Sequence, residues 1–411
     1  MILWIFNHYA VAPDMSGGTR HYDLASELVQ RGYKVAIFAS SFHHGSRREM
    51  KLTSGERWKV EDINGVKFVW IKTFPYQYNN WRRMLNMVSY MLRAWRIGRK
   101  LTRLSPDIER PDVIIGSSVH PLAVLAAVWI AKHYGASFIV EVRDLWPQTL
   151  VDMGILSDHH PLKYILALLE KYFYKRADRI ITLPPKAVDY IIKLDIDPQK
   201  IVWIPNGVNL DRFTKVNDLY QQGNSDVFKI MYVGSHGPSS GLETLLKAAK
   251  ILQNNGYNDI NFILVGDGSE KAKLIEMKDK MNLNNVKFCD PVPKNDIPRK
   301  LLQADALLHI ELEFMCSKYG GSPNKIFDYM GAGKPIIYAS NFVKDMLDEI
   351  GCGIYVAPGD YQALANAIIQ LYKMPVEKRM EIGLKGKEYV MQYHDIPVLA
   401  DKLESCINLN S

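Results

Sequence analysis

The sequence predicts an α/β protein with two Rossmann-like domains, each built on a parallel sheet, that face each other across a cleft. Three observations lead to this prediction. Short apolar stretches of strand length alternate with amphipathic stretches of helix length along the chain. At 411 residues the chain is too long for a single hydrophobic core. A polar stretch, 214–226, interrupts the alternation and resembles a linker.

In the first half, residues 1–213, the predicted strands are short apolar runs bounded by turn residues. A helix is expected after the first of them, from Arg20 to Arg31, and Gly32 would stop it. The strands are Ile2–Phe6, Val35–Ala39, Val113–Gly116, Ser137–Val142, Ile180–Leu183 and Val202–Ile204.

The second half repeats the pattern over residues 227–376. Its predicted strands are Lys229–Val233, Asn261–Val265, Val286–Cys289, Ala306–Ile310, Pro335–Tyr338 and Gly353–Val356. The remaining segment, 377–411, is predicted to be helical and is long enough to cross back to the first domain. Open parallel sheets bind ligands beyond the carboxyl ends of their strands, so the cleft between the domains is the expected site.

The composition is that of an ordinary folded protein, 47% hydrophobic and 23% charged, with a net charge of +7. The four cysteines are too widely spaced for a zinc or disulfide pattern, which favours a reducing compartment. The start, MILWIFN, lacks the basic region of a signal peptide. The longest apolar run, Leu122–Ala131, is too short to cross a bilayer. We therefore expect a cytoplasmic protein without a membrane-spanning helix.

Three loops that follow predicted strands carry glycine, and the first two of them open helices. Glycine lets the backbone approach a ligand closely, and a helix N-terminus offers free N–H groups to an anion. One such loop is weak evidence, because glycine is common in these turns for steric reasons. Together the loops indicate a phosphate-bearing ligand. The residues concerned are Gly17 and Gly18, then Gly234, Ser235, Gly237 and Gly241, and finally Gly266 and Asp267.

A fourth loop, 320–337 (GGSPNKIFDYMGAGKPII), contains a charge in an unexpected place. Ser322 is predicted to be the N-cap of a helix and Pro323 its first residue. Lys325 then falls in the first turn, where a cation is unfavourable by a few tenths of a kcal/mol. A bound diphosphate would reverse that sign, although a lysine that points into water fits the sequence equally well. Asp328, on the same face, is either a ligand of sugar hydroxyls or a solvated carboxylate.

Other ligand motifs are absent or have ordinary explanations. The first loop reads SGGTR instead of GxGxxG, and no acidic residue follows the second strand, which argues against a dehydrogenase. The sequence contains no P-loop. Asp195 and Asp197 form an Asp-x-Asp, but they lie in a polar turn before Pro198. The histidine pairs at 43–44 and 159–160, in polar loops, lack the spacing of metal ligands. We expect no metal site.

In order along the chain, these motifs resemble the family-4 glycosyltransferases, retaining nucleotide-sugar transferases with the GT-B fold. RDLWP, at 143–147, together with SPNK, is similar to a subgroup that builds bacterial surface polysaccharides and includes N-acetyl-fucosamine transferases. The matching stretches are Gly17-Gly18, Ile204–Phe213, Tyr232–Ala249, Leu264–Glu270 and Ser322–Ile337.

The resemblance implies transfer of a sugar, of the N-acetylated amino-sugar kind, from a UDP-sugar to a lipid-linked saccharide, with retention and without a metal. The loop Gly234–Gly241 and the helix start at Ser322, Asn324 and Lys325 would hold the diphosphate. Asp328 would contact the ribose, and Gly266 would lie near the base. Gly17 and Gly18 would approach the donor from the first domain.

The sequence departs from the family pattern at three places. A family glutamate is replaced by Gly320, and Glu311 and Glu313 are candidate substitutes for it. Basic residues of the glycine loop are replaced by Ser235 and Ser240, which places more weight on Lys325. A family histidine is replaced by Arg143, followed by Asp144; both are candidate contacts of the reacting sugar. A nucleotide-sugar-binding protein without activity and a UDP-sugar epimerase remain alternatives.

The segment Arg82–Arg103 carries seven basic residues and no acidic ones. Its helical spacing would place Arg93, Arg96, Lys100 and Arg103 on one face, beside an apolar stripe that consists of Met84, Met87, Val88, Met91 and Trp95. Such a helix suits an anionic membrane surface, and a core helix with a solvated basic face is the alternative. No nucleic-acid-binding motif accompanies the charge. We expect a peripheral protein on the inner face of the cell membrane.

Overall fold

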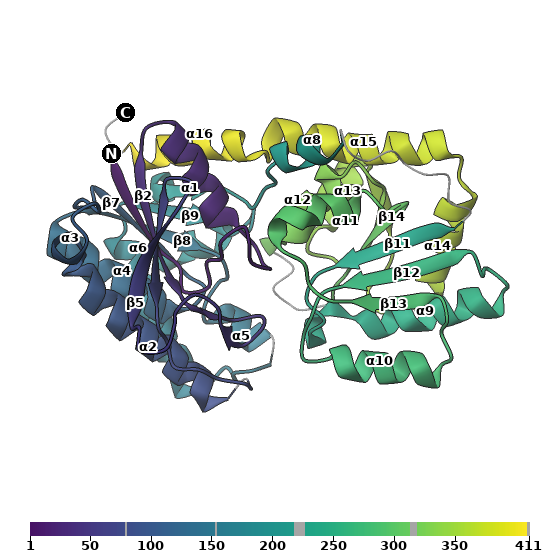
Figure 1. Ribbon diagram of the computed structural model, residues 1–411, viewed down its shortest axis with the longest axis horizontal. Coiled ribbons are helices and arrows are strands. Elements are labelled where there is room, and N and C mark those ends of the chain that lie inside the picture. The colour runs from purple at the N-terminus through teal and green to yellow at the C-terminus, as the bar shows by residue number, and fades with distance from the viewer. Residues whose placement is uncertain (79, 153, 218–226, 313–318, 409–411) are drawn as a thin grey trace.

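The computed structural model describes residues 1–78, 80–152, 154–217, 227–312 and 319–408. It confirms the fold predicted from the sequence, because two α/β domains with largely parallel sheets lie beside each other (Figure 1). Each predicted strand is present within one residue of its expected bounds.

The first sheet has eight described strands in the order β10-β9-β8-β7-β1-β2-β6-β5. All neighbours are parallel except the hairpin of β5 and β6, which the sequence prediction missed. Asn64 and Gly65 form its turn with positive φ angles, so the Asn-Gly pair was the available signal. The strands are β1 Ile2–Phe6, β2 Lys34–Ser40, β5 Trp58–Ile63, β6 Val66–Ile71, β7 Val113–Ser117, β8 Ser137–Val142, β9 Arg179–Thr182 and β10 Ile201–Trp203.

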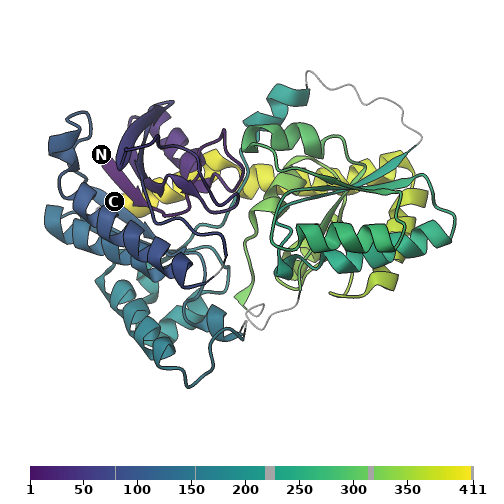
Figure 2. The same cartoon turned by 60° about the horizontal axis from the view of Figure 1, so that its bottom comes forward.

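Helices cover both faces of this sheet. Along β1, Leu3 and Ile5 face the side of α1 (Arg20–Gln30), while Trp4 and Phe6 face α2 and α4. On that second face, α4 lies between α2 and α6 (Figure 2). The other elements are β3 Phe42–His43, β4 Arg48–Glu49, α2 Trp81–Gly98, α3 Leu101–Leu104, α4 Pro121–Tyr134, α5 Gln148–Asp152, α6 Pro161–Arg176, α7 Val188–Ile191, and the 3₁₀ turns η1 Ile192–Leu194 and η2 Pro198–Lys200.

The second sheet has the described order β13-β12-β11-β14-β15-β16, and every neighbour is parallel. Its strands are β11 Phe228–Val233, β12 Ile260–Val265, β13 Val286–Cys289, β14 Ala306–Ile310, β15 Ile336–Ala339 and β16 Gly353–Tyr355. Its helices and 3₁₀ turns are η3 Pro238–Ser240, α9 Leu242–Asn254, α10 Lys271–Lys280, η4 Lys294–Asp296, α11 Ile297–Leu301, α12 Asn324–Gly331, α13 Lys344–Ile350 and α14 Tyr361–Lys373.

The last two helices span both domains. α15 (Val376–Tyr393) packs against α12 of the second domain, and α16 (Ile396–Ile407) packs against α1 of the first (Figure 1, yellow). Arg31 of α1 pairs with Asp401 and Glu404 of α16, so the C-terminal segment is part of the first domain's outer layer.

Two predicted segments differ from the structure. Residues 214–217 belong to α8 (Asp211–Asn217) instead of a linker, because Phe213 is buried and anchors the helix; 218–226 lie outside the described residues. The segment Arg82–Arg103 is not one helix, since α2 ends at Gly98 and the short α3 begins at Leu101. The part of the chain that the structure describes contains no helix long and apolar enough to span a bilayer.

Candidate functional site

A cavity of about 400 Å³ lies between the two domains at the carboxyl ends of their strands. It brings together Arg143, Asp144, Ser322 and Asn324, four of the residues singled out from the sequence. Asn206 and Glu311 also line it, as do Gly320 and Gly321. The site therefore combines the loop after β8 with the loop that precedes α12.

The helix start at α12 differs from its prediction by one residue. Pro323, not Ser322, is the N-cap, and no side chain caps the helix. The Ser322 hydroxyl instead accepts a hydrogen bond of 2.8 Å from the Asn206 backbone N–H of the first domain. Ser322 thus joins the two domains and leaves the first N–H groups of α12 without a side-chain cap.

Lys325 does not extend freely into water. Its Nζ donates to the Tyr232 hydroxyl at 3.3 Å and lies 4.9 Å from the centre of that ring. A Cβ placed on Gly234 would come within 3.4 Å of the same nitrogen. No carboxylate within the described residues forms an ion pair with Lys325. The ammonium therefore stands where the α12 start and the glycine loop meet.

The glycine loops of the second domain have different reasons for their glycines. A Cβ on Gly266, whose φ is +151°, would lie 1.9 Å from the Gly234 carbonyl oxygen. The Asp267 carbonyl accepts from the His236 N–H at 2.9 Å, so these two loops pack backbone against backbone. Gly266 is thus required by loop packing. At Gly237 a Cβ would meet only the Ser235 hydroxyl, so this position stays a candidate for close ligand approach.

The first domain reaches the same helix start. A Cβ on Gly18 would lie 2.8 Å from the Asn324 side-chain nitrogen, and the neighbouring Gly17 has a φ of +135°. Nearby, Asp23 of α1 accepts from both terminal nitrogens of Arg212 in α8, at 2.5 and 3.0 Å. These contacts hold the glycine loop of the first domain against the second.

Asp328 is not a solvated carboxylate, because it is only 7% exposed. Its Oδ2 accepts from Lys294 Nζ at 2.5 Å, and the Lys294 N–H donates to the Met15 carbonyl of the first domain. Charge pairing makes the burial of both groups tolerable. A ribose contact of Asp328 stays a prediction.

Two carboxylates occupy opposite walls of the cavity and titrate differently. The Asp144 side chain is exposed to the cleft, but the protein around it partly desolvates its carboxylate. This desolvation raises the pKa of Asp144, and the positive charge of Arg143 offsets part of the increase. Burial would also raise the pKa of Glu311, but His309, Lys325 and the Ser340 hydroxyl outweigh it and lower the pKa. Glu311 is therefore ionised at neutral pH. Glu313 lies outside the described residues.

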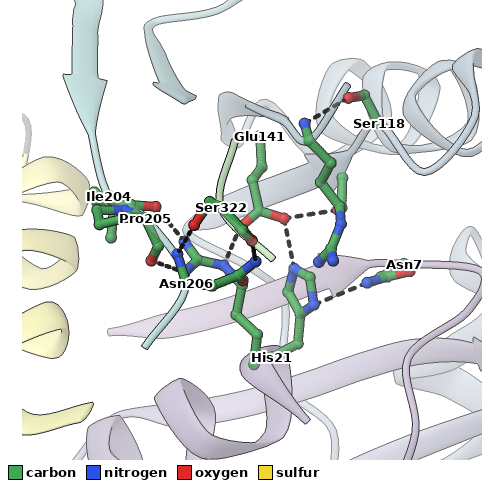
Figure 3. A network of polar contacts seen from close by, with 11 residues as sticks. Asn7, His21, Ser118, Glu141, Ile204, Pro205, Asn206 and Ser322 are labelled. Carbon is green, nitrogen blue, oxygen red and sulfur yellow. Dashed lines mark hydrogen bonds and ion pairs between the residues drawn. The ribbon is translucent and has the colours of Figure 1, made fainter. Parts of the chain in front are cut away.

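A buried network that the sequence did not reveal supports this wall (Figure 3). Glu141 of β8 accepts from Arg20 Nε at 2.8 Å, His21 Nε2 at 2.7 Å and the Ser117 hydroxyl at 2.7 Å. Arg20 also donates to the Ile204 carbonyl, just before Asn206. The only available signal was the carboxylate inside the apolar strand SFIVEV.

The remaining polar motifs have structural roles. Asp197 caps a 3₁₀ turn through the Gln199 N–H, and Asp195 pairs with Lys171 in the left-handed conformation. Nowhere in the described chain do three or more His, Cys, Asp or Glu side chains gather as a metal site would require.

Comparison with protein families gives two matches that together cover most of the chain. Residues 17–207 match the family described as "Glycosyl transferase 4-like domain", and residues 220–389 match "Glycosyl transferases group 1". WcaI of Escherichia coli (strain K12), provisionally named a colanic acid biosynthesis glycosyl transferase, is 21% identical over 382 residues, which are 89% of this chain and 90% of WcaI. An Escherichia coli UDP-Gal:alpha-D-GlcNAc-diphosphoundecaprenol alpha-1,3-galactosyltransferase is 29% identical over 242 residues, 55% of this chain and 59% of the relative.

Solved structures with the same fold extend over the whole chain. Sucrose-phosphate synthase from Thermosynechococcus elongatus superposes with a TM-score of 0.75 at 17% identity, covering 98% of this chain and 97% of the synthase. Anabaena HepE in complex with UDP gives a TM-score of 0.67 at 15% identity, with 98% of each chain covered. At these identities the likeness establishes the GT-B architecture.

Proposed function

Because this chain belongs to the family-4 glycosyltransferases with the GT-B fold, we propose that it transfers a sugar from a UDP-sugar to a lipid-diphosphate-linked saccharide of a bacterial surface polysaccharide, with retention. The position of Lys325, between the α12 start and the glycine loop beside the cavity, carries this proposal. An ammonium and free helix N–H groups stabilise the charge that develops on a departing nucleoside diphosphate.

Two of the similar proteins support these substrate classes. HepE was solved with UDP, and the Escherichia coli galactosyltransferase is named for a UDP-sugar donor and a diphosphoundecaprenol-linked acceptor. The resemblance of RDLWP and SPNK adds an N-acetylated amino sugar as the transferred group. We assign no metal to the reaction, since Lys325 and the helix start supply positive charge at the diphosphate.

Within this mechanism, Glu311 takes the place of the carboxylate that Gly320 lacks. An ionised carboxylate on the cavity wall stabilises the positive charge of an oxocarbenium-like transition state. Asp144, whose pKa is raised, hydrogen-bonds the reacting sugar from the other domain, with Arg143 beside it. Glu311→Gln should lower kcat strongly and leave UDP affinity within about twofold, because the diphosphate site is intact.

The test is turnover of a panel of UDP-sugars, including N-acetylated ones, with a short-chain diphosphate-linked N-acetylglucosamine as acceptor. We expect a transferred sugar whose anomeric configuration, read by NMR, matches the donor, at a rate unchanged by EDTA. Donor interconversion without acceptor would establish an epimerase instead. UDP binding without turnover of any donor would favour the inactive binding protein.

For the membrane, we propose that the helical layer α2–α4–α6 contacts anionic lipid. The basic residues Arg93 and Arg96 of α2 are exposed, as expected. The apolar stripe beside them is only partly available, because Met91 and Trp95 pack against the core. Further along the layer, α6 presents four large apolar side chains to solvent: Tyr164, Ile165, Leu168 and Tyr172.

Vesicle sedimentation tests this surface. The wild type should bind vesicles that contain phosphatidylglycerol more tightly than pure phosphatidylcholine, and salt should weaken the binding. Leu168→Asp should release the protein, whereas Leu384→Asp, at another exposed apolar position, on α15, should not. Equal binding of both variants would refute the assignment to this layer.

A further inference from the structure

The strand order in the sheet of the first domain reverses at β1. From β1 the chain proceeds to β2 and β6 on one side and then crosses to β7 on the other. The loops after β1 and β7 therefore separate at the carboxyl edge, which is the place where open α/β sheets bind ligands. Both loops carry histidine at this point, and the proposed donor site does not use them.

Five side chains meet there, and we call them the switch-point cluster: His8, Tyr9, His44, Arg83 and His120. His8 Nδ1 lies 2.6 Å from His120 Nε2, which links the loops after β1 and β7. The Tyr9 ring stacks on His8 and on His44, with 4.5 Å between ring centres in both pairs. Tyr9, His44 and Arg83 are half-buried and form the accessible side, while His8 and His120 lie beneath them.

The contacts determine where the ring protons lie. His120 Nδ1 accepts a hydrogen bond of 3.2 Å from the Ala123 N–H, so the proton of the neutral ring is on Nε2. That proton is donated to His8 Nδ1, and the proton of His8 must then be on Nε2. His8 Nε2 is buried and has no hydrogen-bond partner among the described residues. The cluster thus contains a buried N–H donor that lacks an acceptor, which is costly.

The surrounding charge has one sign. Burial and the positive charge of Arg83 lower the pKa of His44 to about 4 and that of His120 to about 3. Burial, His120, His44 and Arg83 likewise lower the pKa of His8. Among the described residues, no carboxylate contributes to these pKa shifts. The guanidinium of Arg83 beside neutral rings matches an anion that is rich in oxygen acceptors.

Two neighbours place the cluster beside the proposed reaction site. Ser118, two residues before His120, accepts from the Arg143 N–H at 3.0 Å. On the other side, Trp81 and Met84 of α2 flank Arg83 in sequence and are 64% and 50% exposed. The cluster thus lies between the loop that carries Arg143 and the exposed apolar start of α2.

We infer that the switch-point cluster binds the diphosphate of the acceptor, a lipid diphosphate whose apolar chain leaves along Trp81 and Met84. Arg83 pairs with the anion, Tyr9 and His44 contact it from the accessible side, and His8 and His120 are positioning residues behind them. The inference rests on the proposed function, since it names the subsite for the same acceptor.

Farnesyl diphosphate is the probe, and its binding is measured by calorimetry in the presence of saturating UDP. We expect Arg83→Gln to weaken binding about tenfold or more, because a hydrogen-bonded ion pair is lost. Arg57→Gln removes the same charge from an exposed position of the first domain outside the cluster and should change binding less than about twofold. Arg83→Lys retains the charge and should retain most of the affinity, which controls for a misfolded Arg83→Gln. UDP affinity should be equal in all three variants.

Three results would overturn the inference. The first is no binding of farnesyl diphosphate to the wild type, and the second is an equal loss of affinity in Arg57→Gln and Arg83→Gln. The third is a parallel loss of UDP affinity, which would place Arg83 in the donor site. Inorganic pyrophosphate, which lacks the apolar chain, measures the contribution of the diphosphate alone. Its affinity should fall in Arg83→Gln as that of farnesyl diphosphate does. If the protein binds no UDP, the donor assignment fails, but the same variants without UDP still decide the cluster.

Discussion

Replacement of Lys325 by methionine is the most direct perturbation of the proposed donor site, because it removes the charge and keeps the chain length. Without ligand, two small effects oppose each other. A cation near a helix N-terminus destabilises the folded protein by about 0.3–1 kcal/mol. The contact of the Lys325 ammonium with the Tyr232 ring stabilises it by about 0.5–1 kcal/mol. The stability of the free protein should therefore stay within about 0.5 kcal/mol of the wild type.

With UDP bound, the same charge faces two phosphates. Unit charges about 4 Å apart attract by about 1 kcal/mol in water and about 4 kcal/mol near a protein surface. The half-buried Lys325 lies between these limits, so we expect at least a tenfold loss of UDP affinity, about 1.4 kcal/mol. At a UDP concentration about 100 times the wild-type Kd, the wild type would gain about 2.7 kcal/mol of stability and the variant about 1.4 kcal/mol.

Calorimetry gives the Kd, and thermal unfolding with and without UDP gives the two stabilities. Lys344→Met is a matched control, because Lys344 also lies in the first turn of a helix but pairs with Asp348. Its UDP affinity should equal that of the wild type. A Lys325→Met protein that is folded and binds UDP normally would refute the reasoning, and Lys325 would then have no part in the donor site.

Three further predictions concern the framework of the site. Burial raises the pKa of Glu170 from 4.5 to about 7 in the folded protein, so its contribution to stability is complete below pH 4.5 and is lost as the pH rises through 7. Glu170→Gln should match the wild type at pH 4 and exceed its stability at pH 8 by about 3 kcal/mol; a pH-independent difference in thermal unfolding would contradict this. Gly266→Ala should cost about 2 kcal/mol or more, since its Cβ would collide with the Gly234 carbonyl; an unchanged denaturation midpoint would be inconsistent with the loop packing. Arg212→Ala leaves the buried Asp23 without its ion pair and should lower the free energy of unfolding by about 3 kcal/mol. Urea unfolding measures this loss, with Arg82→Ala as the control. A loss of stability as small as that of the control would show that this pair does not join the domains.

Local patterns were sufficient for most of the fold and for the approximate location of the site. The alternation of apolar strands and amphipathic helices depends on neighbours in sequence, so each strand that it predicted lies within one residue of its observed bounds. It missed the β5–β6 hairpin, although Asn64-Gly65 was a recognisable turn signal. Turn glycines identified the loops but not their roles: Gly266 is required by backbone packing against another loop, which no local pattern shows.

The sequence by itself determined the order of elements, the two-domain architecture and the family resemblance, because these depend on periodicity and on motifs a few residues long. Only the tertiary structure decided which side chains meet across long separations. It turned Ser322 from a helix cap into a partner of Asn206, buried Asp328 against Lys294, and joined His8 to His120. Such pairs form when strands that are distant in sequence become neighbours in a sheet or face each other across a cleft. Their geometry is therefore a property of the folded chain.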